Sequence, residues 1–207
     1  MPRAFAEIAF TPSVQAEQAR MGSAAGYAKF LSPERNGGDA LGPDEAQFIH
    51  MRDGFYQATV SETGWPYVQF RGGPRGFLRV LDARTIGYAD LRGNRQYISL
   101  GNLTDNARVS LILMDYPNQA RLKLWGTVRT VEAAQDPDLI ARLMPDGQDM
   151  TAERAVLIDI AAFDWNCPRN IPQRLTLEEL DPFLEPLRER ISRLETENAA
   201  LKASTSL

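Results

Sequence analysis

Residues 66–116 read PYVQFRGGPRGFLRVLDARTIGYADLRGNRQYISLGNLTDNARVSLILMDY and decide the fold. Four strand-like runs in this stretch surround two loops that carry glycine and arginine. Between Arg71 and Arg95 there are six arginines and only two aspartates, although the whole chain has a formal net charge of -4. Guanidinium groups beside glycine backbone suit a phosphate, which accepts paired N–H donors. The stretch therefore predicts an anion site, against the alternative that arginine is simply the preferred basic residue of a lysine-poor chain.

The pattern of strands continues on both sides of this stretch. The expected strands are 55–62, 65–71, 77–82, 85–90, 107–116, 121–132 and 154–165, with short helices at 94–103 and 136–144. The first two strands should form a hairpin around Gly64, and the next two should pair around Arg84. Strands and helices do not alternate regularly, which favours an antiparallel barrel with helical additions over a doubly wound sheet.

The chain divides by pattern into three parts. Residues 1–54 predict an N-terminal helical segment packed on the barrel, residues 55–175 the barrel itself, and residues 176–207 a C-terminal helix. Within the first part, Thr11 precedes Pro12 in the arrangement of a helix N-cap, and Gly22 is placed to stop that helix. A second short helix is expected over 24–31, and Pro43 should open a third.

Composition narrows the possible functions. The chain has 207 residues, 43 % of them hydrophobic and 24 % charged, which is typical of a globular domain. Its calculated pI near 5.2 argues against a nucleic-acid partner, and no apolar run reaches the ~20 residues of a membrane span. The N-terminus does not resemble a secretory signal, so a cytoplasmic location is expected. With one cysteine, Cys167, and one histidine, His50, we expect no metal site and infer that any chemistry belongs to a bound cofactor.

Four spaced motifs occur in a fixed order along residues 66–109. They have the forms P-x-V-x-x-[KR]-G, G-F-x-x-V-x-D, D-x-x-G-N and N-L-x-x-N-x-R-V. Their residues are Pro66, Val68, Arg71 and Gly72; Gly76, Phe77, Val80 and Asp82; Asp90, Gly93 and Asn94; and Asn102, Leu103, Asn106, Arg108 and Val109.

Together with the tail FDWNCPRNIPQR, these motifs resemble the pyridoxamine 5′-phosphate oxidase-like superfamily of FMN-binding split β-barrels, in its predicted flavin-nucleotide-binding branch. The resemblance covers roughly residues 5–180. It implies a mainly β (α+β) fold, namely a six- to seven-stranded antiparallel split β-barrel with N-terminal helices and a C-terminal heptad-like helix. It also implies a homodimer that holds FMN at the subunit interface.

The resemblance assigns roles to individual side chains. The residues expected to bind the cofactor are Gln69, Phe70, Arg71, Gly72, Ala89, Asp90, Asn94, Arg95, Trp165 and Arg174. Gln69, Arg71, Asn94 and Arg95 should meet the phosphate, the last two at the start of a helix whose free N–H groups favour an anion. Four further residues should lie near the isoalloxazine, namely Phe70, Gly72, Ala89 and Asp90. We expect Asp90 to orient Arg92 or Arg95, or to accept from a ribityl hydroxyl.

The tail departs from that of true pyridoxamine-phosphate oxidases. Those proteins carry a W…R-L-H-x-R segment that holds the vitamer phosphate, whereas residues 164–174 here contain no histidine. Trp165 and Arg174 can keep a flavin-side role, but the vitamin B6 site is not expected.

Several other residues allow two interpretations. For the lone Cys167 a structural role is favoured over redox chemistry, and for His50 a helix-end contact over catalysis. For Trp125, core packing and a flavin-facing position weigh equally, and the following Gly126 indicates a bulge or a close ligand.

The C-terminal helix carries a heptad-like pattern. Leu187, Ile191, Leu194, Asn198 and Leu201 alternate in steps of four and three, as in the d and a positions of a coiled coil. Over this length the seam is too short to hold a dimer alone. The alternative is an amphipathic helix that lies on its own barrel.

Three functions remain open from the sequence. The leading one is an FMN-dependent oxidoreductase that passes a hydride or electrons between a nicotinamide donor and an unknown small substrate, with no side chain required as an acid or base. The second is a non-catalytic flavin- or nucleotide-binding protein. The third keeps the barrel but replaces FMN by F420 or haem, and haem is weakened because His50 is the only imidazole.

Overall fold

The computed structural model describes residues 1–145, 147, 150–165 and 167–205. Its elements follow in the order α1 (Arg3–Ala9), α2 (Pro12–Arg20), α3 (Ala24–Ala28), η1 (Lys29–Leu31), α4 (Pro43–His50), β1 (Gly54–Val60), β2 (Pro66–Gly72), β3 (Arg79–Asp82), β4 (Thr85–Leu91), α5 (Ile98–Asp105), β5 (Arg108–Asp115), β6 (Ala120–Glu132), α6 (Pro137–Leu143), β7 (Ala152–Trp165) and α7 (Leu177–Thr205). The strands and most of the helices lie where the sequence predicted them.

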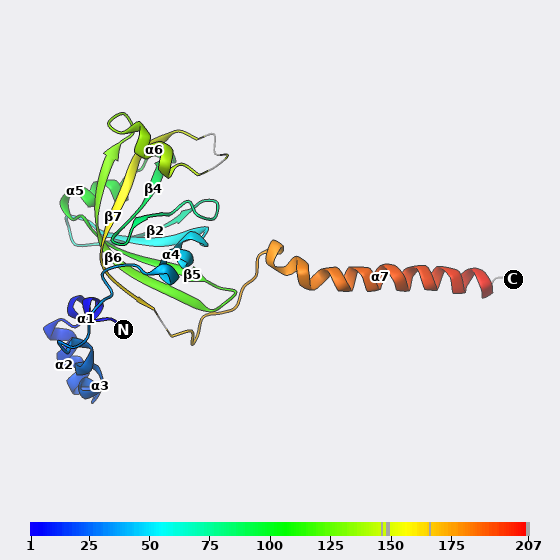
Figure 1. The fold of residues 1–207 in the computed structure, drawn as a ribbon, viewed down its shortest axis with the longest axis horizontal. Helices are drawn as coiled ribbons and strands as arrows, with labels where there is room; N and C mark the ends of the chain where they lie inside the picture. Colours follow the sequence, from blue (N-terminus) through cyan, green and yellow to red (C-terminus); the bar gives the residue numbers. More distant parts are fainter. Residues whose placement is uncertain (146, 148–149, 166, 206–207) are drawn as a thin grey trace. The chain divides into compact units, whose positions relative to one another are not determined.

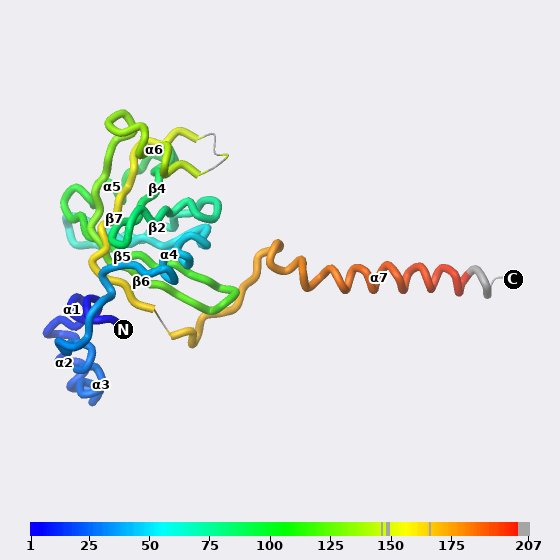
Figure 2. The backbone as a smooth tube through the Cα atoms, viewed as in Figure 1, coloured from blue at the N-terminus to red at the C-terminus, as the bar shows by residue number. Residues whose placement is uncertain are grey.

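The described strands form one seven-stranded antiparallel sheet in the order β2-β1-β5-β6-β7-β4-β3. The two predicted strand pairs form as expected, β1 with β2 and β3 with β4, and β5 pairs with β6 as well. This confirms the α+β split-barrel prediction. Figures 1 and 2 show the sheet curving so that β2 and β4 approach each other although they are distant in the sheet order.

Side chains bridge the split between the two ends of the sheet. The hydroxyl of Tyr88 on β4 donates to Gln57 Oε1 on β1 at 3.1 Å, and Arg71 on β2 pairs with Asp90 on β4 at 2.9 Å. Phe55 packs edge-to-face on Tyr88, with ring centroids 5.6 Å apart. The barrel is therefore closed at this place by aromatic and polar contacts rather than by a strand ladder.

The core follows from strand alternation. In β5 the buried apolar positions are Val109, Leu111 and Leu113, and Leu122 and Leu124 of β6 lie on the same inner face. A smaller cluster around Leu143 and Leu157 packs α6 onto β4 and β7. These two clusters make the barrel a rigid frame on which the loops at the split are held.

The helices before the barrel are built from local signals. The Thr11 hydroxyl caps α2 by accepting from Val14 N, as predicted. Glu45 accepts from the N–H of Gly42 at the start of α4 at 2.9 Å. Helix α1, which the sequence analysis did not single out, lies against β7, and its Phe5 stacks on Trp125 of the neighbouring β6 with ring centroids 4.3 Å apart.

The stacking of Phe5 on Trp125 favours core packing over a flavin-facing position for Trp125. Trp125 packs against α1, its indole N–H donates to Ser110 Oγ at 2.9 Å, and the pairing of β6 with β7 shifts between Trp125 and Gly126. Gly126 is therefore at a bulge, and a Cβ there would stand 2.6 Å from the backbone oxygen of Asp159.

The chain forms two compact units, one of residues 1–115 and 120–169 and one of residues 116–119 and 170–207. In the second unit, Gln119 Nε2 donates to the backbone oxygen of Ile171, and Gln173 Nε2 donates to that of Pro117. The unit also contains α7. Among the described residues, none of the helices combines the length and the apolar character that crossing a membrane requires.

Candidate functional site

Two adjoining clefts open at the split of the barrel. The first has a volume of about 260 Å³ and a mostly polar lining from β2, β4 and the loop before α5. The second has a volume of about 390 Å³ and a more apolar lining. Gln69, Arg71, Asp90, Leu91 and Gly93 line both of them. The two clefts are therefore one continuous depression with a polar and an apolar part.

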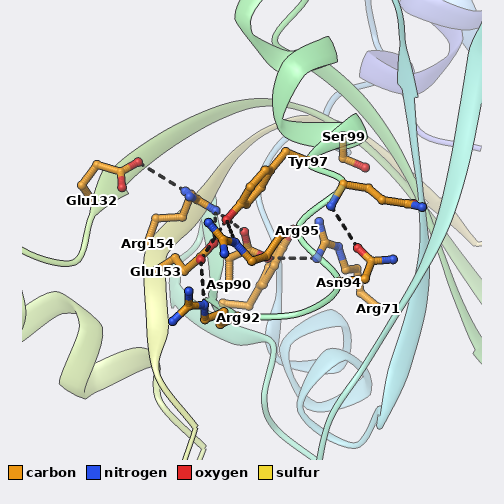
Figure 3. Close-up of polar contacts among 12 residues, drawn as sticks. Arg71, Asp90, Arg92, Asn94, Arg95, Tyr97, Ser99, Glu132, Glu153 and Arg154 are labelled. Atoms are coloured by element: carbon orange, nitrogen blue, oxygen red, sulfur yellow. Dashed lines mark hydrogen bonds and ion pairs between the residues drawn. The ribbon is translucent and has the colours of Figure 1, made fainter.

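An ion-pair network forms the floor of the polar cleft (Figure 3). Asp90 accepts from Arg71 NH1 at 2.9 Å through one carboxylate oxygen and from Arg154 NH1 at 2.7 Å through the other. Arg154 also reaches Glu132 and Glu153, each at 3.3 Å. Strands from opposite ends of the sheet are thereby joined through one carboxylate.

This network corrects an expectation. Asp90 was predicted to orient Arg92 or Arg95, but it holds Arg71 and Arg154 instead. The reason is geometric, because β4 pairs with β7 and places Asp90 directly opposite Arg154 in the register. Arg92 turns toward Glu153, with the nearest atoms 3.9 Å apart.

Burial and hydrogen bonds set the protonation of two groups here. Burial alone would lower the pKa of Arg154, but its hydrogen bonds to Asp90 and Glu132 raise that pKa above the ordinary arginine value. For Tyr88, burial in the barrel raises the pKa to about 12. Both groups therefore keep their protons near neutral pH.

The loop before α5 forms the other wall of the polar cleft. Asn94 Oδ1 accepts from the N–H of Gln96 at 3.1 Å, and Arg95 Nε donates to the Tyr97 hydroxyl at 3.4 Å. Arg95 and Tyr97 both have a positive φ, 61° and 53°, which is a strained conformation for residues other than glycine. Such strain is often found where a loop holds a ligand.

The helix begins later than the sequence predicted. Asn94 and Arg95 were expected to start it, but α5 starts at Ile98 and the left-handed Tyr97 precedes it. The free N–H groups of its first turn belong to Ile98, Ser99 and Leu100, which line the polar cleft. The helix start thus still lies in the cleft, although the two predicted residues are in the loop.

Of the predicted cofactor residues, eight are brought together and two are not. The eight that line one or both clefts are Gln69, Phe70, Arg71, Gly72, Ala89, Asp90, Asn94 and Arg95. Gln69 also accepts from Ser99 Oγ at 3.0 Å, which ties β2 to α5.

Trp165 and Arg174 do not line either cleft. The Trp165 indole donates to Glu45 Oε1 at 2.7 Å and lies edge-to-face on Phe48. Arg174 belongs to the second unit, where its guanidinium lies 4.9 Å from the ring centroid of Tyr116. Trp165 is thus held beside α4, and Arg174 is described only within its own unit.

Sequence reasoning missed three residues of the site. Arg154, Glu153 and Tyr97 contribute to the polar cleft or its floor. Arg154 had a signal that was available, because it opens an apolar strand and a buried arginine needs a partner. Glu153 and Tyr97 gave no comparable signal, since charged and aromatic residues at strand and loop ends are usually solvated.

Comparison with known proteins gives one match to a family model. Residues 42–166, more than half of the chain, match the model described as pyridoxamine 5′-phosphate oxidase. Comparison with the curated proteins finds no match.

Among solved structures, the HupZ protein of Group A Streptococcus is 14 % identical over 65 % of this chain and 99 % of its own, with a TM-score of 0.49. An FMN-binding protein of Syntrophomonas wolfei subsp. wolfei is 11 % identical over 60 % of this chain and 85 % of its own, with a TM-score of 0.48. An F420 reductase is 19 % identical over 59 % of this chain and 98 % of its own, with a TM-score of 0.41. These likenesses are too distant to bear on function.

Proposed function

The chain belongs to the pyridoxamine 5′-phosphate oxidase family, and from that premise we propose that it binds FMN in the two clefts at the split of its barrel. The phosphate is assigned to the polar cleft and the isoalloxazine to the apolar one. The observation that carries the proposal is the position of Arg71, which lines both clefts and joins them.

The polar cleft suits a phosphate. Arg71 NH1 is paired with Asp90, but its Nε is buried without a hydrogen-bond partner among the described residues. A buried donor without an acceptor is costly, and a phosphate oxygen is an acceptor of the right kind. Arg95 and the first turn of α5 add a guanidinium and free N–H groups.

The carboxylates of the cleft do not oppose this assignment. Asp90 is held between two arginines, and Glu153 accepts from the Tyr97 hydroxyl at 3.0 Å while it pairs with Arg154. Their charges are therefore largely compensated before a ligand arrives, whereas Arg95 is exposed and donates only to the neutral Tyr97 hydroxyl among the contacts described.

The apolar cleft suits a planar ring. Phe70, Phe77 and Tyr88 contribute to its lining, together with Ala89, whose small side chain leaves room beside β4. Gly72 and Gly73 continue from β2 along the same cleft and leave room for its aromatic lining, since a Cβ would stand 2.9 Å from the Phe70 ring at Gly72 and 2.7 Å from the Phe77 ring at Gly73.

Next to the apolar cleft, the outer face of β2, β1 and β5 carries exposed apolar side chains. Phe70 and Ile112 lie opposite Tyr56 in the two strand registers, and their exposed fractions are 58 %, 36 % and 40 % respectively. Val68, 59 % exposed, extends the patch. We assign this face to the interface of a homodimer, because Phe70 would then connect it to the flavin cleft.

The activity proposed for the loaded protein is oxidoreduction of a small substrate. Bound FMN supplies hydride or electron transfer, with a nicotinamide nucleotide as the proposed donor. The residues of this chain bind and orient: Arg71 and Arg95 hold the phosphate, and Phe70 and Tyr88 border the ring. None of them is required to exchange a proton with the substrate.

Equilibrium titration tests the proposal. The purified full chain is titrated with FMN, riboflavin and F420, and binding is followed by flavin or deazaflavin fluorescence. We expect FMN to saturate one site per protomer and to bind at least tenfold more tightly than riboflavin, since the phosphate contributes charge-assisted hydrogen bonds worth about 1.5–3 kcal/mol. Preferential binding of F420 would mean that the clefts bind F420 and not FMN. If none of the three compounds binds, the proposal is wrong.

A further inference from the structure

Helix α7 is longer than the heptad pattern seen in the sequence. It runs over 29 residues from Leu177 to Thr205, so ten residues precede Leu187 within the same helix. When the same alternation is continued toward the N-terminus, it reaches three further leucines. The a positions are then Leu177, Leu184, Ile191 and Asn198, and the d positions are Leu180, Leu187, Leu194 and Leu201. The helix therefore has room for four heptads, twice the length over which the pattern was first recognised.

The start of the helix is defined by its own capping residues. Thr176 Oγ1 accepts from the N–H of Glu179 at 3.2 Å, and the Glu179 carboxylate accepts from the N–H of Thr176 at 2.9 Å. This reciprocal capping box satisfies two helix-terminal donors. The register is thus set from Leu177 onward by local chemistry.

The two prolines inside the helix do not interrupt the seam. In the heptad register Pro182 takes position f and Pro186 takes position c. Both positions face away from the partner in a two-stranded coil, so the proline rings lie on the outside, although each proline removes one backbone hydrogen bond of the helix. The apolar stripe continues past both.

Most of the apolar seam residues are open to solvent. Leu177, Leu187, Ile191, Leu194 and Leu201 are 83 %, 56 %, 56 %, 47 % and 66 % exposed, whereas Leu180 and Leu184 are half-buried. A continuous apolar stripe of this length marks an interaction surface, because soluble proteins rarely leave such a stripe uncovered.

The flanking charges identify the partner. In a parallel, in-register pair, position g of one helix faces position e of the next heptad in the other. Arg190 then faces Glu195 of the second copy, and Glu197 faces Lys202 of the second copy, so both contacts are attractive. A parallel pair also places Asn198 opposite its own copy, where the two amides can bond, whereas an antiparallel pair would set it against leucine.

We propose that α7 forms a parallel, in-register, two-stranded coiled coil with α7 of a second copy of this chain. This second contact between copies is independent of the flavin clefts and of the apolar face of β2, β1 and β5. Its function is to hold two chains together through their C-terminal ends whether or not flavin is bound.

Disulfide trapping in the full chain tests the proposal. Cys167, which is the only cysteine, is first replaced by serine. Leu187→Cys and Leu201→Cys are then made separately in that background, and each protein is oxidised mildly and separated on a non-reducing gel. In a parallel in-register coil each d residue lies beside its own copy, so both variants should form covalent dimers in high yield.

Matched controls use outward-facing f positions of the same heptads. Glu189→Cys and Thr196→Cys, both at exposed positions, should stay near the low cross-linking level of the Cys167→Ser parent. Equal yields at d and f positions, or no trapping at either d position, would refute the coiled coil. Trapping at only one of the two d positions would refute the parallel register. The FMN affinity of these variants, measured by flavin titration, should equal that of the Cys167→Ser parent. The cross-linking result therefore tests the coiled coil independently of the FMN proposal.

Discussion

At the scale of single residues, the site depends on one carboxylate between two arginines. Asp90 has a side-chain exposure of 14 %, and the two oxygens of its carboxylate are used by different strands. The sequence showed that Asp90 stands among arginines but could not show which of them it contacts. That choice is made by the register of β4 against β7, which is a property of the folded sheet.

Replacing Arg154, which is buried, by leucine should destabilise the barrel strongly. The change removes the partner of Asp90 across the β4–β7 pair and leaves Asp90 with Arg71 alone. We expect a loss of about 3 kcal/mol in the free energy of unfolding, measured by urea denaturation. Arg129→Leu, which removes an exposed pair with Asp159, serves as the control and should cost less than about 1 kcal/mol. Equal losses in the two variants would show that the network at the split contributes no more than a surface pair.

Tyr88 should make stability fall in alkaline solution. Its pKa is raised by burial from 10.0 to about 12, so the folded state keeps a proton that the unfolded state releases. The stabilisation is complete below pH 10 and is lost as the pH rises through about 12, with a total of roughly 2–3 kcal/mol.

The comparison protein for this prediction is Tyr88→Phe. It loses the hydrogen bond to Gln57 at every pH, but it should show a shallower decline of the unfolding free energy above pH 10. Urea denaturation of both proteins between pH 9 and 12 measures the difference. Parallel declines would mean that the Tyr88 hydroxyl is not responsible.

At the scale of elements, strand alternation and turn residues predicted the sheet well. All the expected strands are present, because period-two patterns and Gly64 or Arg84 turns are local signals. Helix α5 was placed four residues too early, since Asn94 and Arg95 look like a helix start but form a strained loop. The C-terminal helix was predicted over residues 176–207 and is found as α7, but the heptad seam within it was recognised only from Leu187 onward.

A charge on the outer face of β5 should weaken the barrel dimer. Ile112→Lys places an ammonium group within the apolar patch of Tyr56 and Phe70. Burying it twice in a symmetric interface should raise the dimer dissociation constant at least a hundredfold. Sedimentation equilibrium measures this, in a Leu194→Glu background so that α7 does not hold the copies together.

Thr130→Lys in the same background is the matched control, since Thr130 is exposed on β6 and outside the patch. Its dissociation constant should equal that of the background protein. If both lysine variants behave alike, the face of β2, β1 and β5 is not the interface.

At the scale of the whole molecule, membership of the family does not imply that this chain has the activity for which the family is named. The match covers residues 42–166, and the segment beyond it contains no histidine, because His50 is the only one in the chain. We therefore expect the FMN-loaded protein not to oxidise pyridoxine 5′-phosphate. Formation of pyridoxal 5′-phosphate is followed by its absorbance, with a true oxidase as the positive control, and turnover at a comparable rate would contradict the expectation.

Two contacts between copies are proposed, and they act on the cofactor differently. The barrel face lies next to the apolar cleft, so dimerisation through it should strengthen FMN binding, and FMN should strengthen dimerisation by the same factor. The α7 seam shares no residue with the lining of the clefts and should raise the local concentration of barrels without changing the site itself.

The central claim is that Arg71 and Arg95 bind the phosphate of FMN, and the ratio of FMN to riboflavin affinity measures it directly. The ratio is determined by fluorescence titration for the parent, Arg71→Ala, Arg95→Ala and the control Arg84→Ala, whose guanidinium pairs with Asp39 outside the clefts. The phosphate contact predicts that each of the first two variants binds FMN ten- to a hundredfold more weakly while riboflavin affinity changes little. The control should keep the parent ratio. If the ratio is the same in all four proteins, the phosphate is not bound by these arginines and the assignment of the clefts is wrong.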